Sequence, residues 1–168
     1  TGSGKTLAIQ TPLILDGPEA GLTLVIVPTT ALAIDQARQM KQLVGNRWDG
    51  FENSGLAFYG DLKDTAKNKI RERIRSGTQG ILFTSPESAI GSLAPAIWDA
   101  CKKGNFKCLA IDEAHMVAGW GDYFRPEFQL LSGFRNGLLR EAGGYPFKTL
   151  LLSATLTQRS IRILKKFY

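Results

Sequence analysis

The sequence is poor in the residues that form disulfides and hold transition metals. Its 168 residues include two cysteines, Cys101 and Cys108, and one histidine, His115. The cysteines form no C-x-x-C pair and have no set of histidines near them, so the pattern predicts no zinc site in this chain. Two unpaired thiols are typical of a protein kept in a reducing compartment, and we expect a cytoplasmic location.

Long apolar runs are also absent. No stretch reaches the roughly 20 apolar residues that span a bilayer, and the first residues do not resemble a signal peptide, so we expect no membrane partner. Hydrophobic residues make up 43% of the chain and charged residues 21%, which is ordinary for one globular domain over residues 1–168. The net charge of +6 favours a polyanionic partner such as nucleic acid but does not establish one.

What the sequence does have is a regular alternation of two kinds of segment. Apolar, β-branched runs predict strands at 21–27, 56–59, 81–84, 107–111 and 149–152. Helical spacing predicts helices at 6–15, 31–44, 62–75, 93–103, 127–141 and 158–167. Strands that are apolar on both faces are typical of a parallel sheet covered by helices on each side. We therefore expect an α/β fold, a three-layer sandwich around a mostly parallel sheet.

Unusual polar and proline residues follow four of the predicted strands directly. They are Pro28-Thr29, Thr84-Ser85-Pro86, Asp112-Glu113 and Ser153-Ala154-Thr155. Right-handed crossovers bring the carboxyl ends of parallel strands to one edge of the sheet, where ligands of such folds bind. The sequence therefore predicts one shared site at that edge.

The chain opens on a glycine-rich segment that matches the end of the phosphate-binding pattern G-x-x-x-x-G-K-[ST]. The candidate phosphate-binding residues are Thr1, Gly2, Ser3, Gly4, Lys5 and Thr6. Backbone N–H groups of such a loop face phosphate oxygens, while Lys5 would reach the β- and γ-phosphates and Thr6 would ligate Mg²⁺. The alternative is a simple Gly-Ser turn before a helix. Because a phosphate loop normally follows a buried strand, we expect this chain to be a piece of a longer protein, with that N-terminal strand missing here.

An acidic pair follows the predicted strand at 107–111. An apolar strand that ends in a carboxylate is typical of the second nucleotide-binding motif, so Asp112 would hold Mg²⁺. Glu113 would orient and polarise the attacking water as a general base. The alternative is an acidic helix start, where carboxylates are favoured anyway. The predicted catalytic residues are thus Lys5, Asp112 and Glu113, with ATP and Mg²⁺ as cofactors.

The acidic box 112–115, which reads DEAH, together with the Ser153-Ala154-Thr155 triplet resembles motifs II and III of superfamily 2 helicases. The resemblance implies a RecA-like P-loop NTPase fold, the first of two lobes. It also implies that motif III links ATP hydrolysis to movement on nucleic acid, and hydrogen bonds from Ser153 and Thr155 to His115 are the contact we expect to make that link. The alternative is that the triplet only caps a helix.

The segment 112–128, DEAHMVAGWGDYFRPEF, is similar to the RecQ-like DNA helicases. The matching positions are Trp120, Gly121, Phe124, Arg125, Pro126 and Phe128. In that family the loop senses single-stranded DNA, which implies that Trp120 and Phe124 stack on bases and Arg125 pairs with phosphate. The alternative is that the two rings pack in the core. Asp122 stands where the family usually has a histidine, so the loop departs from the pattern there.

Two further segments resemble superfamily 2 motifs that touch the nucleic-acid backbone. Residues 27–32 with 35–36 resemble motif Ia, and residues 84–87 resemble the motif written T-P-E. The resemblance implies backbone contacts from Pro28, Thr29, Thr84 and Pro86. Ordinary helix capping is the alternative for each.

Together these patterns predict the motor lobe of an ATP-dependent DNA helicase, which binds and hydrolyses Mg-ATP to drive translocation and unwinding of DNA. The resemblance implies that arginine fingers come from a second RecA-like lobe. Since such a finger contributes about 10³–10⁵ in rate, we expect little ATPase activity from this chain alone. Three alternatives stay open at this point, namely a nucleic-acid-stimulated ATPase that remodels complexes without unwinding, an RNA helicase, and a non-catalytic binding module.

Overall fold

The computed structural model describes residues 4–45, 47–48, 51, 54–118 and 126–168. In these residues five strands form one sheet in which every pair of neighbours is parallel. In sheet order the strands are β2 (Ala57–Phe58), β3 (Ile81–Thr84), β1 (Leu22–Ile26), β4 (Phe106–Ile111) and β5 (Lys148–Leu151). The parallel α/β fold expected from the sequence is therefore confirmed.

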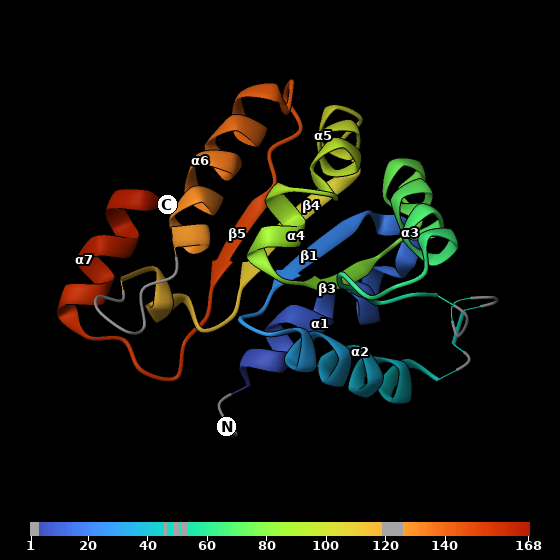
Figure 1. The fold of residues 1–168 in the computed structure, drawn as a ribbon, viewed down its shortest axis with the longest axis horizontal. Helices are drawn as coiled ribbons and strands as arrows, with labels where there is room; N and C mark the ends of the chain where they lie inside the picture. Colours follow the sequence, from blue (N-terminus) through green and yellow to red (C-terminus); the bar gives the residue numbers. More distant parts are fainter. Residues whose placement is uncertain (1–3, 46, 49–50, 52–53, 119–125) are drawn as a thin grey trace.

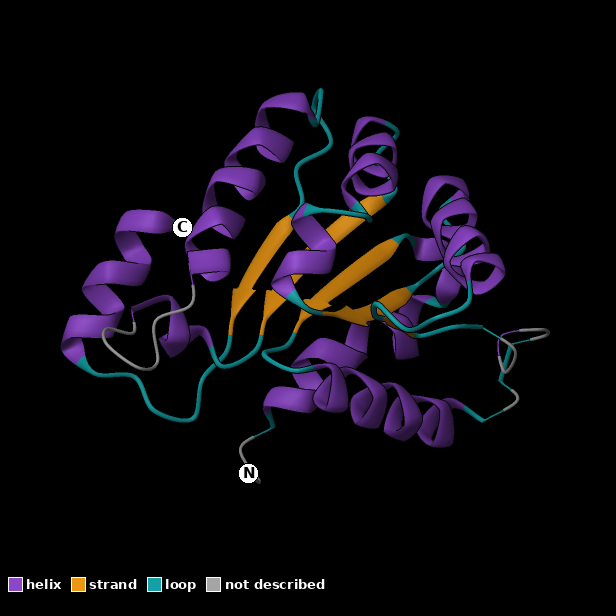
Figure 2. Ribbon diagram, viewed as in Figure 1, coloured by secondary structure: helices purple, strands orange, loops and turns teal. Residues whose placement is uncertain are grey.

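Helices cover both faces of this sheet (Figures 1 and 2). One face carries α1 (Lys5–Asp16) and α2 (Thr30–Val44), and the other carries α3 (Asp64–Ser76), α4 (Pro86–Ile90), α5 (Ala94–Lys102) and α6 (Pro126–Glu141). The last helix, α7 (Gln158–Phe167), packs against the 3-10 helix η3 (Ala114–Ala118), and a second 3-10 turn, η1, spans Pro18–Ala20. The result is the three-layer sandwich expected of a RecA-like domain.

The central strand β1 shows why this sheet needs two helical layers. Every residue of β1 is buried. Leu22, Leu24 and Ile26 belong to the core cluster that includes the α3–α6 layer. Val25 and Val27 belong to the cluster on the α1–α2 side. Because successive strand residues point to opposite faces, a strand that is buried at every position is stable only between two covering layers.

The start of β1 depends on a glycine because neighbouring backbone comes very close. Gly21 has φ +108, a region open mainly to glycine. A Cβ atom at this position would lie 2.7 Å from the carbonyl oxygen of Asn105. That same oxygen accepts a hydrogen bond from the N–H of Leu22 at 2.6 Å, which fixes the start of β1 against the segment that leads into β4.

The carboxyl ends of β1, β4 and β5 are joined beyond the strands themselves. The N–H of Asp112 donates to Ile26 O at 2.9 Å, and the N–H of Leu152 donates to Ile111 O at 2.9 Å. The N–H of Ala114 then donates back to Leu152 O at 2.8 Å. These bonds hold the acidic box and the segment after β5 in fixed register at one edge of the sheet. Among the described residues, no helix combines the length and the apolar character needed to cross a membrane.

Candidate functional site

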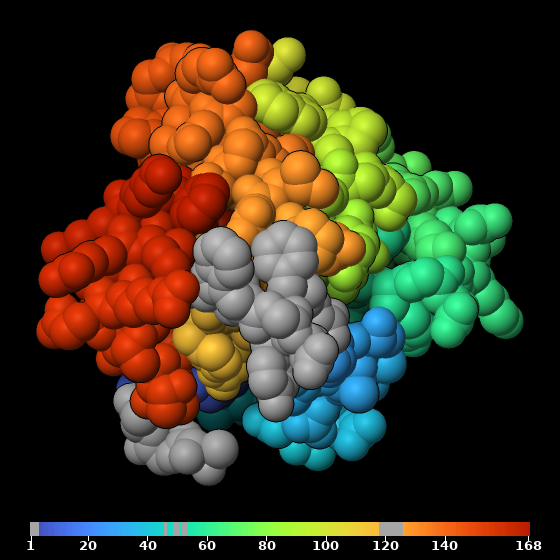
Figure 3. Space-filling model, turned by 60° about the vertical axis from the view of Figure 1, so that its left-hand side comes forward, coloured from blue at the N-terminus to red at the C-terminus, as the bar shows by residue number. Residues whose placement is uncertain are grey.

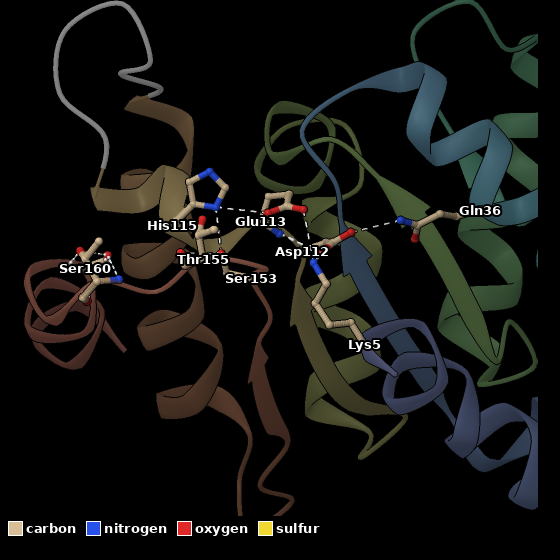
Figure 4. Close-up of polar contacts among 9 residues, drawn as sticks. Lys5, Gln36, Asp112, Glu113, His115, Ser153, Thr155 and Ser160 are labelled. Carbon is tan, nitrogen blue, oxygen red and sulfur yellow. Dashed lines mark hydrogen bonds and ion pairs between the residues drawn. The ribbon is translucent and has the colours of Figure 1, made fainter. Parts of the chain in front are cut away.

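Three charged side chains that are far apart in the chain meet at the carboxyl edge of the sheet (Figure 4). Lys5 is the first residue of α1, and its Nζ lies 3.4 Å from Glu113 Oε1 and 4.0 Å from Asp112 Oδ1. The three side chains are partly buried, with exposed fractions of 20% for Lys5, 15% for Asp112 and 30% for Glu113. Parallel topology brings the end of β4 to the start of α1, so the structure unites the residues that the sequence names as catalytic. Their roles stay predictions.

The start of α1 is suited to bind an anion. Gly4, at the N-cap, has φ +71, and a Cβ added there would meet nothing within 4 Å, so the approach to the first turn is open. No side chain caps this end, and the first turn contains no acidic residue, which leaves its N–H groups and the positive helix end facing outward. Thr6 is exposed in that turn. Thr1, Gly2 and Ser3 lie outside the described residues.

The turn after β4 is strained. Glu113 has φ +52 and is the one non-glycine among the described residues with a positive φ. Holding such a residue in the left-handed region costs about 1–3 kcal/mol, which the surrounding contacts must offset. One of these contacts is local, since the N–H of Glu113 donates to Asp112 Oδ1 at 2.9 Å. The turn points both carboxylates toward Lys5 (Figure 4).

Gln36, for which the sequence predicts no role, also contacts Asp112. The side-chain amide of Gln36 donates from Nε2 to Asp112 Oδ2 at 3.2 Å. The two oxygens of Asp112 are therefore engaged on different sides, one by the N–H of Glu113 and one by Gln36. The spacing of Thr29 and Gln36 in the sequence could have indicated this contact. Gln36 lies seven residues after Thr29, and two turns of helix place it on the same face of α2, the helix that starts at this edge.

The acidic box and the triplet after β5 are joined through one imidazole. His115 Nδ1 lies 2.9 Å from Ser153 Oγ and 3.2 Å from Glu113 Oε2. A carboxylate can only accept hydrogen bonds, so a favourable contact with Glu113 requires a proton on Nδ1. Ser153 Oγ in turn donates to the carbonyl of Thr155 at 3.1 Å, and the N–H of Thr155 lies 3.3 Å from the same hydroxyl. Thr155 thus bonds to Ser153 through its backbone.

This arrangement differs in part from the expected one. Ser153 meets His115 directly, whereas Thr155 is exposed and is connected to His115 through Ser153. Ala154 is also exposed and has no polar side-chain atom to contribute. The described contacts therefore form a path from Glu113 through His115 to Ser153. η3, which begins just before His115, reaches the surface beside α7 (Figure 3).

The predicted nucleic-acid contacts occupy different environments. Thr29 is exposed and caps α2, with its Oγ1 accepting from Leu32 N at 3.3 Å. Pro28, Thr84 and Pro86 are buried. The hydroxyl of Thr84 donates to Phe58 O at 2.9 Å, which gives this residue a structural role between β3 and β2. A contact of these residues with nucleic acid stays a prediction, and Trp120, Phe124 and Arg125 lie outside the described residues.

We expect Thr84→Val to lower the free energy of unfolding by about 1–3 kcal/mol, because valine keeps the shape but leaves Phe58 O without its buried donor. Chemical denaturation followed by circular dichroism measures this change. Thr65→Val, at an exposed position of α3, is the matched control and should change stability by no more than about 0.5 kcal/mol. Equal stability of the two variants would show that the Thr84 hydroxyl does not support the edge of the sheet.

Most cations of the basic helix α3 are already used within the fold. Lys67 donates to Gly60 O at 2.6 Å and Arg71 to Ser92 O at 3.1 Å. Arg73 donates to Thr78 O at 3.0 Å, and Arg75 forms an ion pair with Asp99 at 2.9 Å. These contacts tie α3 to its neighbours, so the charge of this helix does not by itself indicate a nucleic-acid surface.

The oxygen atoms at the site suit a hard cation. In the ranges that the structure covers, no group of three or more His, Cys, Asp or Glu side chains could hold a metal ion by itself. Mg²⁺ usually binds through one or two protein oxygens and takes its other ligands from phosphate and water. Asp112 and the hydroxyl of Thr6 near an open helix start fit that donor set.

Comparison with known proteins identifies the family. The profile of the DEAD/DEAH box helicases matches residues 1–164. The chain is 34% identical over 165 residues to the RecQ-like DNA helicase blm-1 of Caenorhabditis elegans, covering 96% of this chain and 15% of that protein. It is 28% identical over 164 residues to the ATP-dependent DNA helicase RecQ of Synechocystis sp. (strain ATCC 27184 / PCC 6803 / Kazusa), covering 96% of this chain and 31% of that protein. The chain therefore spans less than a third of the length of either relative.

Solved structures share the fold. The structure of the DUF1998 helicase MrfA bound to DNA and AMPPNP has a TM-score of 0.72 at 19% identity, covering 99% of this chain and 22% of that one. A hypothetical ATP-dependent RNA helicase from Sulfolobus tokodaii has a TM-score of 0.63 at 22% identity, covering 99% of this chain and 43% of that one. At these identities the likeness concerns the fold alone. The family profile, by contrast, extends over nearly the entire sequence, and on that ground the chain belongs to the DEAD/DEAH box helicase family.

Proposed function

We propose that residues 1–168 form the first motor lobe of an ATP-dependent DNA helicase of the RecQ type. The observation that carries this proposal is the meeting of Lys5, Asp112 and Glu113 at the carboxyl edge of the sheet, next to the open start of α1. A cation and two carboxylates in that position are among the groups that ATP hydrolysis requires of the protein. The names of the relatives, RecQ-like and ATP-dependent DNA helicases, support DNA as the nucleic acid along which the motor moves.

The roles of the residues follow from their positions. The phosphate loop, with Thr1, Gly2, Ser3 and Gly4, and the first N–H groups of α1 would bind the phosphates of ATP. Lys5 would turn from the two carboxylates to the β- and γ-phosphates, and Thr6 and Asp112 would hold Mg²⁺.

Glu113 is the proposed general base. Its carboxylate would orient the attacking water and accept its proton at an Oε atom. Mg-ATP supplies the bond that is broken and the positive charge that offsets the negative charge developing on the phosphates. An arginine finger would come from a second RecA-like lobe, which we propose as the partner of this carboxyl edge.

DNA would be contacted along the same edge. Thr29 is exposed at the N-terminus of α2, where a hydroxyl and free N–H groups are suitable donors to phosphate. Trp120 and Phe124 would stack on bases and Arg125 would pair with phosphate, as the resemblance to RecQ-like proteins implies. The translocating strand would then lie close to the path from Glu113 to Ser153.

The test is made on the full-length protein, with ATP hydrolysis and strand separation measured in parallel. We expect single-stranded DNA to stimulate hydrolysis more than RNA of the same sequence, and a forked DNA duplex to be unwound in the presence of ATP and Mg²⁺. Stronger stimulation by RNA would point to an RNA helicase. DNA-stimulated hydrolysis without unwinding would point to a translocase that remodels complexes.

We expect His115→Ala and Ser153→Ala to reduce the stimulation of ATP hydrolysis by DNA roughly 5- to 150-fold, the usual size of a coupling between two sites. The reason is that each change removes a link in the path from Glu113 to the segment after β5. The ratio of turnover with and without saturating DNA measures the effect. Ser92→Ala, at an exposed position, is the control, and a normal ratio in all three variants would refute this path.

A reducing, cytoplasmic location is part of the proposal. Cys101 and Cys108 are free thiols, and both are buried. Burial raises the pKa of Cys108 to about 11, which keeps it in the unreactive thiol form. Neither cysteine is therefore placed for oxidation or for binding a metal.

A further inference from the structure

The side-chain amide of Gln36 has an incomplete set of hydrogen bonds. Its Nε2 donates to Asp112 Oδ2 at 3.2 Å, but its Oε1 is buried and has no partner. Ser54, Arg73 and Gln79 are the other described residues with a buried, unpartnered side-chain atom, and Gln36 is the one of the four that bonds to the candidate site. A buried acceptor without a donor lowers stability, so its retention needs an explanation.

The chemistry of the two groups determines the orientation of this amide. A carboxylate only accepts hydrogen bonds, so the NH₂ group of Gln36 has to face Asp112. Turning the amide over would place two acceptors against each other. The oxygen is therefore directed away from Asp112 by the same bond that holds the carboxylate (Figure 4).

The helix that carries Gln36 packs firmly against the sheet. In α2, Ala33, Ala37 and Met40 are buried against the sheet. Gln36 lies between Ala33 and Ala37 and is itself half-buried, so its side chain has limited freedom to leave Asp112. The surrounding structure thus fixes both ends of the bond, one on α2 and one at the end of β4.

We propose that Gln36 is a positioning residue for the cation of the proposed nucleotide site. Through Nε2 it holds the Asp112 carboxylate so that the other oxygen, Oδ1, faces Lys5 Nζ at 4.0 Å beside the start of α1, where a cation would bind. Oδ1 also accepts from the N–H of Glu113 at 2.9 Å, and its second lone pair is the one that would meet the cation. This inference rests on the proposed function, since it assigns Mg²⁺ to the same site. It explains why an amide with a buried, unsatisfied oxygen is kept beside the acidic box.

The apolar variant Gln36→Met distinguishes this positioning role from a purely structural role. Methionine has a similar length and fills the same space without polar atoms, so it removes the unsatisfied oxygen together with the bond to Asp112. If Gln36 served stability, the variant would melt at a lower temperature. If Gln36 serves the cation, the variant keeps its melting temperature in the absence of Mg²⁺ and loses affinity for the ion.

The same helix offers a matched control. Gln39 also donates from Nε2 to an aspartate, Asp35 Oδ2, at 2.7 Å, but this pair is exposed and lies away from the acidic box. Gln39→Met therefore makes the same chemical change in the same helix. It removes a glutamine–aspartate bond without touching the candidate site.

The experiment measures binding rather than turnover in the full-length protein. A fluorescent ATP analogue is titrated at a series of Mg²⁺ concentrations, and thermal unfolding is recorded in EDTA. For Gln36→Met we expect the Mg²⁺ concentration at half-maximal enhancement of binding to rise about 10- to 100-fold, as is usual when a residue that orients a metal ligand is removed. Binding of the analogue in EDTA and the melting temperature should match those of Gln39→Met and of the unmodified protein.

Two results would overturn the inference. One is an unchanged Mg²⁺ midpoint in Gln36→Met, and the other is a melting temperature in EDTA clearly below that of Gln39→Met. Neither result touches the proposed function, which fails separately if the unmodified protein binds the analogue no better with Mg²⁺ than in EDTA.

Discussion

Replacing Glu113 by glutamine is expected to lower DNA-stimulated ATP turnover about 10²- to 10⁴-fold, the usual contribution of a general base. Glutamine has the same size and can adopt the same strained backbone, so the turn after β4 should be preserved. What is lost is the ability to accept a proton from water. Binding of ATP should change little, because Lys5 and the N-terminus of α1 are intact.

Steady-state hydrolysis in the full-length protein measures this effect, together with equilibrium binding of a fluorescent ATP analogue. Glu72→Gln is the matched control, since Glu72 is exposed on α3 away from the site. Retention of more than half of the normal turnover by Glu113→Gln would remove Glu113 from the mechanism and revive the hypothesis of a non-catalytic binding module.

Replacing Lys5 by methionine is expected to weaken nucleotide binding itself. Loss of one partner from a partly buried, hydrogen-bonded charge pair costs about 2–5 kcal/mol, which corresponds to roughly 30- to 4,000-fold in Kd. Lys5 lies between the start of α1 and both carboxylates, so it is the charge that can compensate for the phosphates there. Methionine keeps much of the length of the side chain and removes only its cation.

The measurement is the Kd of the same ATP analogue in the presence of Mg²⁺. Lys69→Met serves as control because Lys69 is exposed on α3 and its loss changes the net charge by the same amount. A Kd within twofold of normal for Lys5→Met would mean that the opening segment of the chain is a turn and not a phosphate loop. The Glu113→Gln and Lys5→Met variants thus separate hydrolysis of ATP from its binding.

The strands could be predicted from the sequence almost residue by residue, but their order could not. Runs such as 81–84 are apolar, β-branched and bounded by turn residues, so local pattern alone identifies β3. Which strand pairs with which depends on contacts between distant segments, and no local pattern contains them. The sequence does not predict the short helix α4, because its five residues, Pro86–Ile90, are too few to show a helical period. The one local sign of this helix is Ser85, whose hydroxyl accepts a hydrogen bond from the N–H of Ser88 and caps its N-terminus.

The site was predictable where the topology of a parallel sheet decides the outcome. Lys5, Asp112 and Glu113 meet because the ends of the strands share an edge. The topology does not determine the direction in which a side chain points. Thr84 is the last residue of β3, and the pleat turns its hydroxyl toward Phe58 O in the interior and not toward a ligand. The bond from Gln36 to Asp112 depends on how α2 lies against β4, which the sequence does not show.

The complete burial of β1 and β3 has a consequence for how this lobe can move. Amides in the middle of such strands exchange with solvent only when the domain opens globally, so they should be among the most slowly deuterated in the chain. β4 pairs with β1 along its length, and Asp112 extends that ladder, so the acidic box is attached to the part of the molecule that opens last. We therefore expect any change of shape during a catalytic cycle in segments outside the central strands, such as η3 and the residues from Ser153 onward. The central strands act as a stationary frame against which those segments are displaced.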